Sequence, residues 1–439
     1  MTAESQKLSL WAAVFININI MIGIGLFVNT TVLAQSLGAF GWAAYAILAV
    51  LLLPLIVSIA KLVEIYPIGG FYTYASESLN PFAGFLSAWC YFTAKLASAT
   101  LMIHTSMQLL QQIIPILSSF CTFTLDIIMM SLFMGLNMFH MRAGKSVQVV
   151  FLCMKLIPIL FVVFMGMFFF STDNLTSSSP EAYQFISAMP LVLFAALGFE
   201  ATTSLSGNIK DAKRNGPRAI LISYLTVVCL NVLYQLFFYD VLGSTLAQAS
   251  GFLQAFPLLI NKCCGNNSFG LFMQNLCNIA IASSALGGAF GILFSNSWNL
   301  HTLAQKGHIL KAYLFLKENR FGIPFGCIIA EGALFIVYLF GTRAAQIPLQ
   351  QIAAFGSTIA YTLSILALLA VTLKKKAPHV ALWIPVLGLV NCLFFLASCL
   401  NSFYTRGAHS LYLYGILLIF GISLFLLTLR RSSTQPQCH

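Results

Sequence analysis

Charged residues are scarce in this chain of 439 residues: Asp, Glu, Lys and Arg together make up 8% of it. An ordinary soluble domain carries about 25% charged residues. Hydrophobic residues instead make up 59% of the sequence, and the mean hydropathy is +0.90. This composition excludes an ordinary soluble domain and is typical of an all-α protein with many membrane-spanning segments.

The sequence also lacks the residue patterns of metal, cofactor and catalytic sites. Its 11 cysteines include no C-x-x-C pair, and its 7 histidines form no zinc-type cluster with them. A membrane-embedded enzyme would need a polar catalytic constellation, and a channel would need a filter or rings of charge. We therefore expect no metal, no cofactor and no enzymatic activity, and we rank a channel low.

Long apolar runs fill the chain, and a membrane helix needs about 20 such residues. We expect twelve spans, with short loops and no inserted soluble domain, at about 10–35, 40–63, 82–114, 122–140, 147–170, 185–208, 219–242, 270–302, 324–341, 348–372, 379–402 and 409–429.

Basic residues are distributed unevenly between alternate loops. When the amino terminus is placed inside, three basic residues lie outside, namely Lys262, Arg343 and Arg406. Two more, Lys95 and Lys155, lie within spans. The other seventeen lie inside: Lys7, Lys61, Arg142, Lys145, Lys210, Lys213, Arg214, Arg218, Lys306, Lys311, Lys317, Arg320, Lys374, Lys375, Lys376, Arg430 and Arg431. The positive-inside rule then places both termini in the cytoplasm. The net charge of +11 is thus explained by topology and does not predict a nucleic-acid partner.

Two apolar segments contain interruptions at corresponding positions of the two halves of the chain. "NINIMIGIGLFVN" (17–29) places Gly23 and Gly25 in the middle of the first span, and "ALGFEATT" (196–203) interrupts the sixth. Glycine in a membrane helix also serves close packing, which is the simpler explanation for either one alone. Interruptions at matching positions instead favour a secondary transporter built from inverted repeats.

Four stretches resemble the amino acid–polyamine–organocation (APC) transporters, in order along nearly the whole chain. They are "GIGLF" (23–27), "YPIGGFYTYASESLNPFAGF" (66–85), "GFEATTSLSGNIKDAKRNGPRAI" (198–220) and "LAQKGHI" (303–309), although His308 and Ile309 depart from the usual pattern. Bacterial amino acid antiporters and permeases are the most similar members.

The resemblance implies a LeuT-type fold with five helices in each of two inverted repeats and with broken helices one and six. It places a ten-helix transport core at 1–372, with repeats at about 9–171 and 185–372, and two additional helices with a cytoplasmic tail at 373–439. It also implies a location in a bacterial inner membrane. The sequence does not indicate an oligomeric state.

The two interruptions are the expected substrate site. Amide groups of Ile22, Gly23, Ile24 and Gly25 suit a substrate carboxylate, and carbonyls near Gly198 suit its ammonium group. By resemblance, an aromatic gate falls at Phe194 and another aromatic of the site at Phe290. Plain packing is an alternative for both, because the chain has 39 phenylalanines.

Two charged residues in spans are candidates for coupling and gating. A buried lysine in the bilayer is costly, so Lys155 should face the bundle interior unless it snorkels to the cytoplasmic edge. The resemblance implies that its ammonium fills the place of a sodium ion beside helices one and eight. Glu200 follows the second interruption and either accepts hydrogen bonds from the broken backbone or takes part in proton coupling.

Lys95, in the third span, falls by its spacing near the expected substrate side chain. An ammonium there would repel cationic substrates and favour acidic or hydrogen-bonding ones. Alternatively, it pairs with Glu200 or another buried acid.

The sequence thus predicts a sodium-independent secondary transporter of amino acids, working by antiport or with protons, in a lipid bilayer. The alternatives are an exchanger of polyamines or other organocations and, less favoured, a channel.

Overall fold

The structure, a computed structural model, describes residues 8–67, 70–139, 145–176, 179–200, 209–377 and 379–434. Within these ranges the chain is helical, and its only β-bridges are two isolated ones, Leu8 with Ile209 and Glu318 with Pro324. The α-helices are α1 (Leu10–Met21), α2 (Gly25–Leu37), α3 (Gly41–Ile65), α4 (Phe71–Ser78), α5 (Pro81–Ile113), α6 (Pro115–Ser118), α7 (Thr122–Met138), α8 (Lys145–Phe168), α9 (Ala182–Ala196), α11 (Ala212–Leu242), α12 (Ser244–Gln248), α13 (Phe252–Cys264), α14 (Ser268–Gln305), α15 (Ala312–Leu316), α16 (Phe325–Gly341), α17 (Gln346–Leu373), α18 (Trp383–Arg406) and α19 (His409–Thr434).

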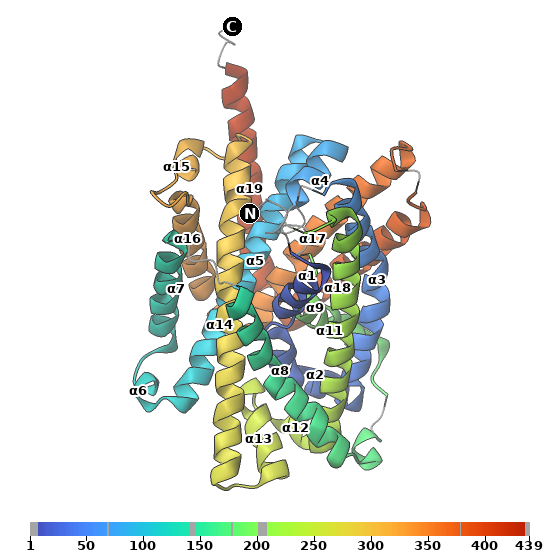
Figure 1. The fold of residues 1–439 in the computed structure, drawn as a ribbon, viewed down its shortest axis with the longest axis vertical. Helices are drawn as coiled ribbons and strands as arrows, with labels where there is room; N and C mark the ends of the chain where they lie inside the picture. The colour runs from blue at the N-terminus through green and yellow to red at the C-terminus, as the bar shows by residue number, and fades with distance from the viewer. Residues whose placement is uncertain are drawn as a thin grey trace.

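The two longest helices, α5 and α14, pack along each other through the bundle, as Figure 1 shows. Both begin at an asparagine whose side-chain oxygen accepts a backbone amide of the first turn: Asn80 from Ala83 at 2.9 Å and Asn267 from Gly270 at 2.8 Å. Such N-caps satisfy amide groups that a helix start leaves unpaired. At 33 and 38 residues, these helices are about 50 and 57 Å long.

Described helices lie in each of the twelve ranges expected to span the membrane, but not all of them, α5 among others, are both long and apolar enough to cross it. Six segments are long and apolar enough to cross a bilayer: Gly25–Ile65, Ala212–Leu242, Ser268–Gln305, Gln346–Leu373, Trp383–Arg406 and His409–Arg430. Six shorter apolar helices are Leu10–Met21, Thr122–Met138, Leu152–Phe168, Ala182–Ala196, Phe252–Cys264 and Phe325–Gly341. The fold is therefore that of an all-helical multi-pass membrane protein, and twelve crossings stay a prediction.

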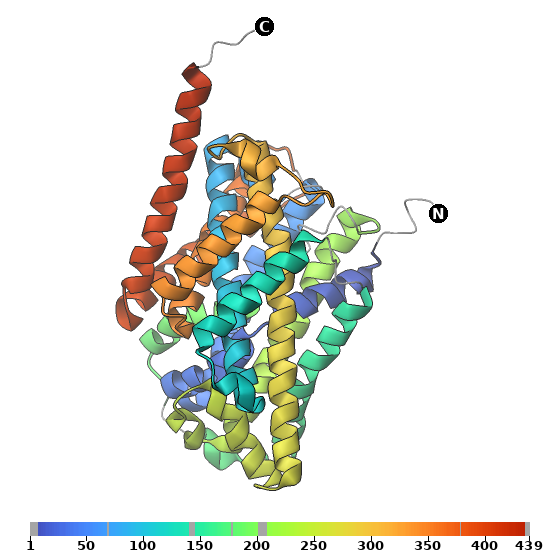
Figure 2. The same ribbon diagram turned by 90° about the vertical axis from the view of Figure 1, so that its left-hand side faces the viewer.

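The helix ends define two opposite ends of the bundle. In Figure 1, α4 and α15 lie at the upper end, where α19 also finishes, and α6, α12 and α13 lie at the lower end. Figure 2 shows α19 along one side of the molecule, directed away from the other helices at its C-terminal end. The end that holds α4 and α15 is called the α4 end here, and the opposite end the α13 end.

Both interrupted segments contain helix ends where the sequence places them. The first expected span consists of α1 and α2, which are separated by Ile22–Ile24. In the sixth expected span, α9 ends at Ala196, and the described residues that follow it, 197–200, form a turn. Two parts of the family motifs lie outside the described residues: positions 201–208 of the motif at 198–220, and positions 68 and 69 of the motif at 66–85.

Candidate functional site

The first helix break is a short turn with little free backbone. Ile22 leaves the helix at φ −72° and ψ 80°, and the Gly23 amide donates to the Met21 carbonyl at 2.8 Å. Helix α2 then starts at Gly25, and the first turn of a helix leaves amide groups without intrahelical partners. The α2 N-terminus, more than the Gly23 amide, therefore offers donors and a positive dipole end at this break.

The second break lies directly against the first. Gly198 has φ +120°, in a region that side-chain-bearing residues rarely adopt, and a Cβ there would lie 3.1 Å from the backbone of Ile20 and Met21. Asn17 joins the same elements, because its amide donates to the Phe199 carbonyl at 3.3 Å and to the Ser223 hydroxyl of α11 at 3.1 Å. Glycine at position 198 thus allows the two interrupted backbones to touch.

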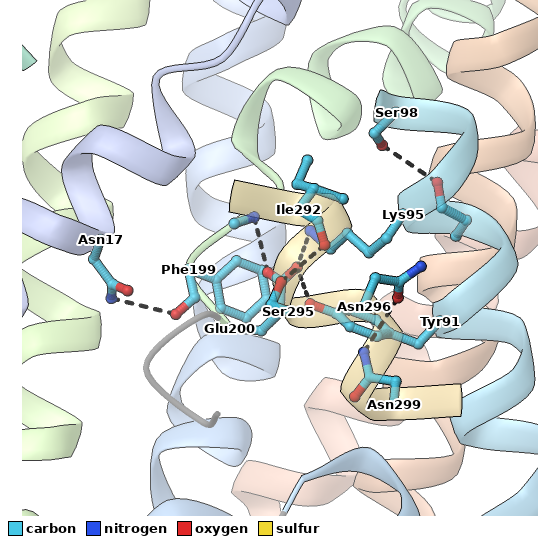
Figure 3. Close-up of polar contacts among 12 residues, drawn as sticks. Asn17, Tyr91, Lys95, Ser98, Phe199, Glu200, Ile292, Ser295, Asn296 and Asn299 are labelled. Carbon is cyan, nitrogen blue, oxygen red and sulfur yellow. Dashed lines mark hydrogen bonds and ion pairs between the residues drawn. The ribbon is translucent and has the colours of Figure 1, made fainter. Parts of the chain in front are cut away.

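A buried ion pair lies beside the breaks (Figure 3). The Lys95 ammonium, from α5, pairs with the Glu200 carboxylate, whose Oε1 also accepts the Tyr91 hydroxyl at 3.2 Å. Its other oxygen accepts the Gly198 amide at 2.8 Å. Glu200 is fully buried and Lys95 nearly so. The carboxylate therefore connects an unbroken helix to the turn that follows α9.

A small pocket lies between the breaks and the ion pair. Its lining includes Gly23, Gly25, Lys95 and Phe194. The other lining residues come from α1, from α9 and the residue after it, from α14 and from α5: Ile20, Met21, Ala195, Leu197, Ile292, Ser98 and Met102. Its volume is about 20 Å³, enough for roughly one water molecule and too small for an amino acid. The pocket must therefore widen before it can hold a substrate.

Lys155 lies in α8, outside this pocket. Its side chain is 1% exposed, and its ammonium donates to the Asn19 carbonyl in the last turn of α1. The last carbonyls of a helix have no intrahelical partner, and a nearby cation stabilises them. The lysine therefore ties α8 to the end of the interrupted helix from within the bundle.

The remaining predicted site residues lie around the pocket rather than in its lining. None of Ile22, Ile24 and Gly198 lines the pocket, and the side chains of Ile22 and Ile24 are buried elsewhere. Phe290 packs edge-on against Phe133 of α7, with ring centroids 5.5 Å apart. The lining residue of α14 is Ile292, two positions further along.

Sequence reasoning missed three contributors from α5: Tyr91, Ser98 and Met102. Their signal was their spacing from Lys95, since residues three or four apart share a helix face. It also missed the pairing of His104 with Asp126 of α7, whose Nδ1 and Oδ2 atoms are 2.7 Å apart. No single-sequence signal connects these two residues, because 22 positions separate them.

Comparison with known proteins shows the family of this chain. The family model for amino acid permeases matches residues 8–425. The b(0,+)-type amino acid transporter 1 of Mus musculus is 22% identical over 425 residues, covering 91% of this chain and 84% of that protein. The low-affinity putrescine importer PlaP of Escherichia coli K12 is 28% identical over 216 residues, covering 45% and 46%. An uncharacterized transporter of Mycobacterium tuberculosis H37Rv is 23% identical over 397 residues, covering 88% and 84%.

The family model and the relatives, together with the helical fold and its apolar segments, define the class as an integral, multi-pass membrane transporter and not an enzyme. The chain belongs to the amino acid permease family, within the APC transporters that its sequence motifs resemble.

Proposed function

We propose that the protein is a secondary active transporter that moves amino acids across a bacterial cytoplasmic membrane by alternating access. Transport proceeds by exchange or with protons, and without sodium. The observation that carries this proposal is the pair of adjoining helix breaks with the Lys95–Glu200 ion pair on the pocket beside them. Interrupted helices at the bundle centre are typical of substrate sites in secondary transporters.

The two breaks suit the two charges of an amino acid. The N-terminus of α2 at Gly25 offers amide donors to a carboxylate, and the carbonyl end of α9 near Leu197 offers acceptors to an ammonium group. Because Gly198 brings the breaks into contact, both groups of one small zwitterion lie within reach. The pocket is closed at about 20 Å³, so binding is coupled to a rearrangement of these elements.

Lys155 and Glu200 are the proposed coupling residues. The Lys155 ammonium supplies a fixed positive charge at the end of α1, which a bound sodium ion would otherwise supply. Glu200 joins α5 to the turn after α9, so its protonation or the arrival of a substrate carboxylate at Lys95 would release that connection. This arrangement favours protons or counter-substrate as the driving partner.

The second candidate is an exchanger of polyamines or other organocations, favoured by the similarity to the putrescine importer. Lys95 argues against it, because a diamine in the pocket would bring a second ammonium beside the one already there. We therefore propose amino acids with neutral, polar or acidic side chains as the substrates.

The proposed orientation places the α4 end and both termini in the cytoplasm. It rests on the basic residues of the alternate loops, of which the sequence places seventeen on the predicted inside and three on the predicted outside. Within this topology we propose residues 1–372 as the transport core, with repeats at 9–171 and 185–372, and residues 373–439 as two additional helices and a tail.

Counterflow in proteoliposomes tests the proposal. Vesicles loaded with an unlabelled amino acid are diluted into labelled amino acid in sodium-free buffer, and uptake is compared with vesicles loaded with buffer, with putrescine or under an inward proton gradient. We expect saturable uptake stimulated by internal amino acid or by protons. Uptake that occurs only with internal putrescine would instead establish the amine exchanger, and uptake that requires sodium would contradict the coupling.

A further inference from the structure

A second and larger cavity lies at the α13 end of the bundle, the proposed extracellular side. Its volume is about 370 Å³, and it is formed by the C-terminal part of α5, the start of α13 and the connection between α16 and α17. We call it the vestibule. Figure 1 shows α13 at this end of the molecule, remote from α4 and α15.

The vestibule lies next to the small pocket along one helix. On α5, Ser98 and Met102 line the small pocket, whereas Leu101 and Thr105 line the vestibule. Three residues along a helix correspond to a rise of about 4.5 Å. A ligand in the vestibule would therefore be one helical turn away from the proposed substrate site.

Side-chain amides of α17 join the vestibule wall to both interrupted segments, and we call these hydrogen bonds the seal. Gln346, which lines the vestibule, donates to the Val28 carbonyl of α2 at 2.9 Å. One turn deeper, Gln350 donates to Asn29 at 2.8 Å, and Asn29 donates to the Leu191 carbonyl of α9 at 2.7 Å. A residue of the vestibule wall is thus part of the hydrogen bonds that connect α17 to α2 and, through Asn29, to α9.

One permanently charged side chain lines the vestibule among the described residues, and it is positive. Arg343 and His104 are its only lining residues with a basic group, and none is acidic. The His104 ring is held by the buried Asp126 of α7, whose Oδ2 lies 2.7 Å from its Nδ1. Arg343 is exposed and supplies the charge.

The backbone that presents Arg343 is strained. Arg343 and Ala344 have φ of 53° and 51°, and they are the only two consecutive non-glycine residues with positive φ in the described part of the chain. Helices commonly end on one such residue, usually a glycine. Side-chain-bearing residues adopt this conformation only at a cost in free energy. Strain of this kind is concentrated at ligand-binding positions.

We propose that the vestibule is a separate binding site for the carboxylate of an amino acid, with Arg343 as its anchor. The inference rests on the proposed function in taking the ligand from the amino acids. Arginine binds carboxylates through two parallel hydrogen bonds. A ligand held there is positioned against Gln346, so the site loads the transporter from outside before the seal to the inner pocket opens.

Thiol labelling of Ala345→Cys tests the charge of the vestibule directly. Ala345 is exposed and lines the cavity. We expect a negatively charged sulfonate methanethiosulfonate to react faster than its trimethylammonium analogue, and Arg343→Gln to lower the ratio of the two rates about fivefold. Arg406→Gln is the matched control, because Arg406 is another outside arginine and does not line the vestibule. The wild type gives the background from native cysteines.

Protection of the same thiol by ligands tests the carboxylate. L-Glutamate and L-glutamine should slow labelling, and agmatine, which has no carboxylate, should not. Arg343→Gln should raise the ligand concentration needed for protection about tenfold, which equals about 1.4 kcal/mol of binding free energy. The concentration needed by Arg343→Lys should lie between those of the wild type and Arg343→Gln. Equal protection by agmatine, or protection unchanged in Arg343→Gln, would overturn the proposal. If counterflow occurs but no amino acid slows thiol labelling, the vestibule site is contradicted and the proposed transport is not. If amino acids slow labelling but no counterflow occurs, the proposed transport is contradicted.

Discussion

At the scale of single residues, the Lys95–Glu200 pair is the costliest polar feature of the site. Removing one partner of a buried ion pair leaves an uncompensated charge and costs about 3–5 kcal/mol, whereas replacing both by neutral groups of similar shape is often tolerated. We expect Lys95→Met and Glu200→Gln each to lower the thermal unfolding temperature in detergent, and the double variant to recover most of the loss. An additive loss would show that the two charges do not depend on each other.

Lys95 also sets the expected substrate preference. An unpaired like charge at about 4 Å costs on the order of 4 kcal/mol at an effective dielectric near 20. Glu200 pairs with Lys95 and offsets most of this repulsion, so we expect discrimination of about tenfold in affinity. Arginine, lysine and agmatine should therefore compete poorly for uptake, and Lys95→Ala should admit them while weakening any acidic substrate. The check is competition by arginine and glutamate in both proteins. Equal binding of arginine to the wild type and Lys95→Ala would remove Lys95 from substrate recognition.

The two glycines of the first break have different surroundings, so they should respond differently to alanine. A Cβ on Gly25 would lie 2.8 Å from the Ala195 backbone, whereas one on Gly23 would meet only the flexible end of Met102 at 3.0 Å. We expect Gly25→Ala to cost about 1–3 kcal/mol by overpacking, and Gly23→Ala to fold normally but transport poorly, because its methyl group fills the small pocket. Unfolding temperature and uptake rate, measured together, separate these effects. An equal fall in unfolding temperature in Gly23→Ala and Gly25→Ala would contradict the different surroundings assigned to the two glycines.

At the scale of helices, Lys155 joins α8 to the end of α1. Lys155→Ala leaves the Asn19 carbonyl without this donor, and we expect transport to slow more than substrate binding weakens. Uptake by the wild type should be unchanged when sodium is replaced by choline. Lys61→Ala is the control, since Lys61 pairs with Glu64 on a partly exposed surface. Transport at the wild-type rate by Lys155→Ala would limit this lysine to a packing role.

The connection after α14 makes a pH-dependent contact with α4. The ring of His308 lies 2.8 Å from the Tyr72 hydroxyl, and burial, together with the nearby Lys306, lowers the pKa of His308. The unfolded chain therefore binds more protons than the folded one as pH falls through about 6.5, so stability should decrease between pH 7.5 and 5.5. His308→Gln should lessen that decrease, and His379→Gln, at an exposed position, should not. An unchanged pH profile in His308→Gln would contradict this account.

Helix positions were easier to predict from the sequence than side-chain neighbours. The apolar runs and the Gly23–Gly25 pair indicated where helices lie and where the first one breaks, because both depend on local composition. The choice between Phe290 and Ile292 depended on the rotation of α14, and two positions differ by about 200° around a helix. The seal by Gln346 and Gln350 joins residues more than 300 positions apart, which no local pattern specifies.

At the scale of the whole molecule, the orientation can be tested with the loops. We expect a small epitope inserted at Gly407, at the α13 end, to be reached by antibody on intact cells. One inserted among Lys374–Lys376 should be reached only after permeabilisation, because basic loops stay in the cytoplasm. Retained uptake by each insertion variant is the control for folding. The reverse pattern would contradict cytoplasmic termini.

The buried ion pair also determines how a membrane voltage acts on the transport cycle. Moving one elementary charge through 100 mV is worth about 2.3 kcal/mol, so a charged empty site would be driven strongly in one direction. Lys95 and Glu200 cancel each other when the pocket is closed, so this part of the site carries no net charge. In the proposed cycle, the reorientation of the empty pair is then insensitive to voltage. The electrical work of the exchange reflects the charge difference between the two cargoes.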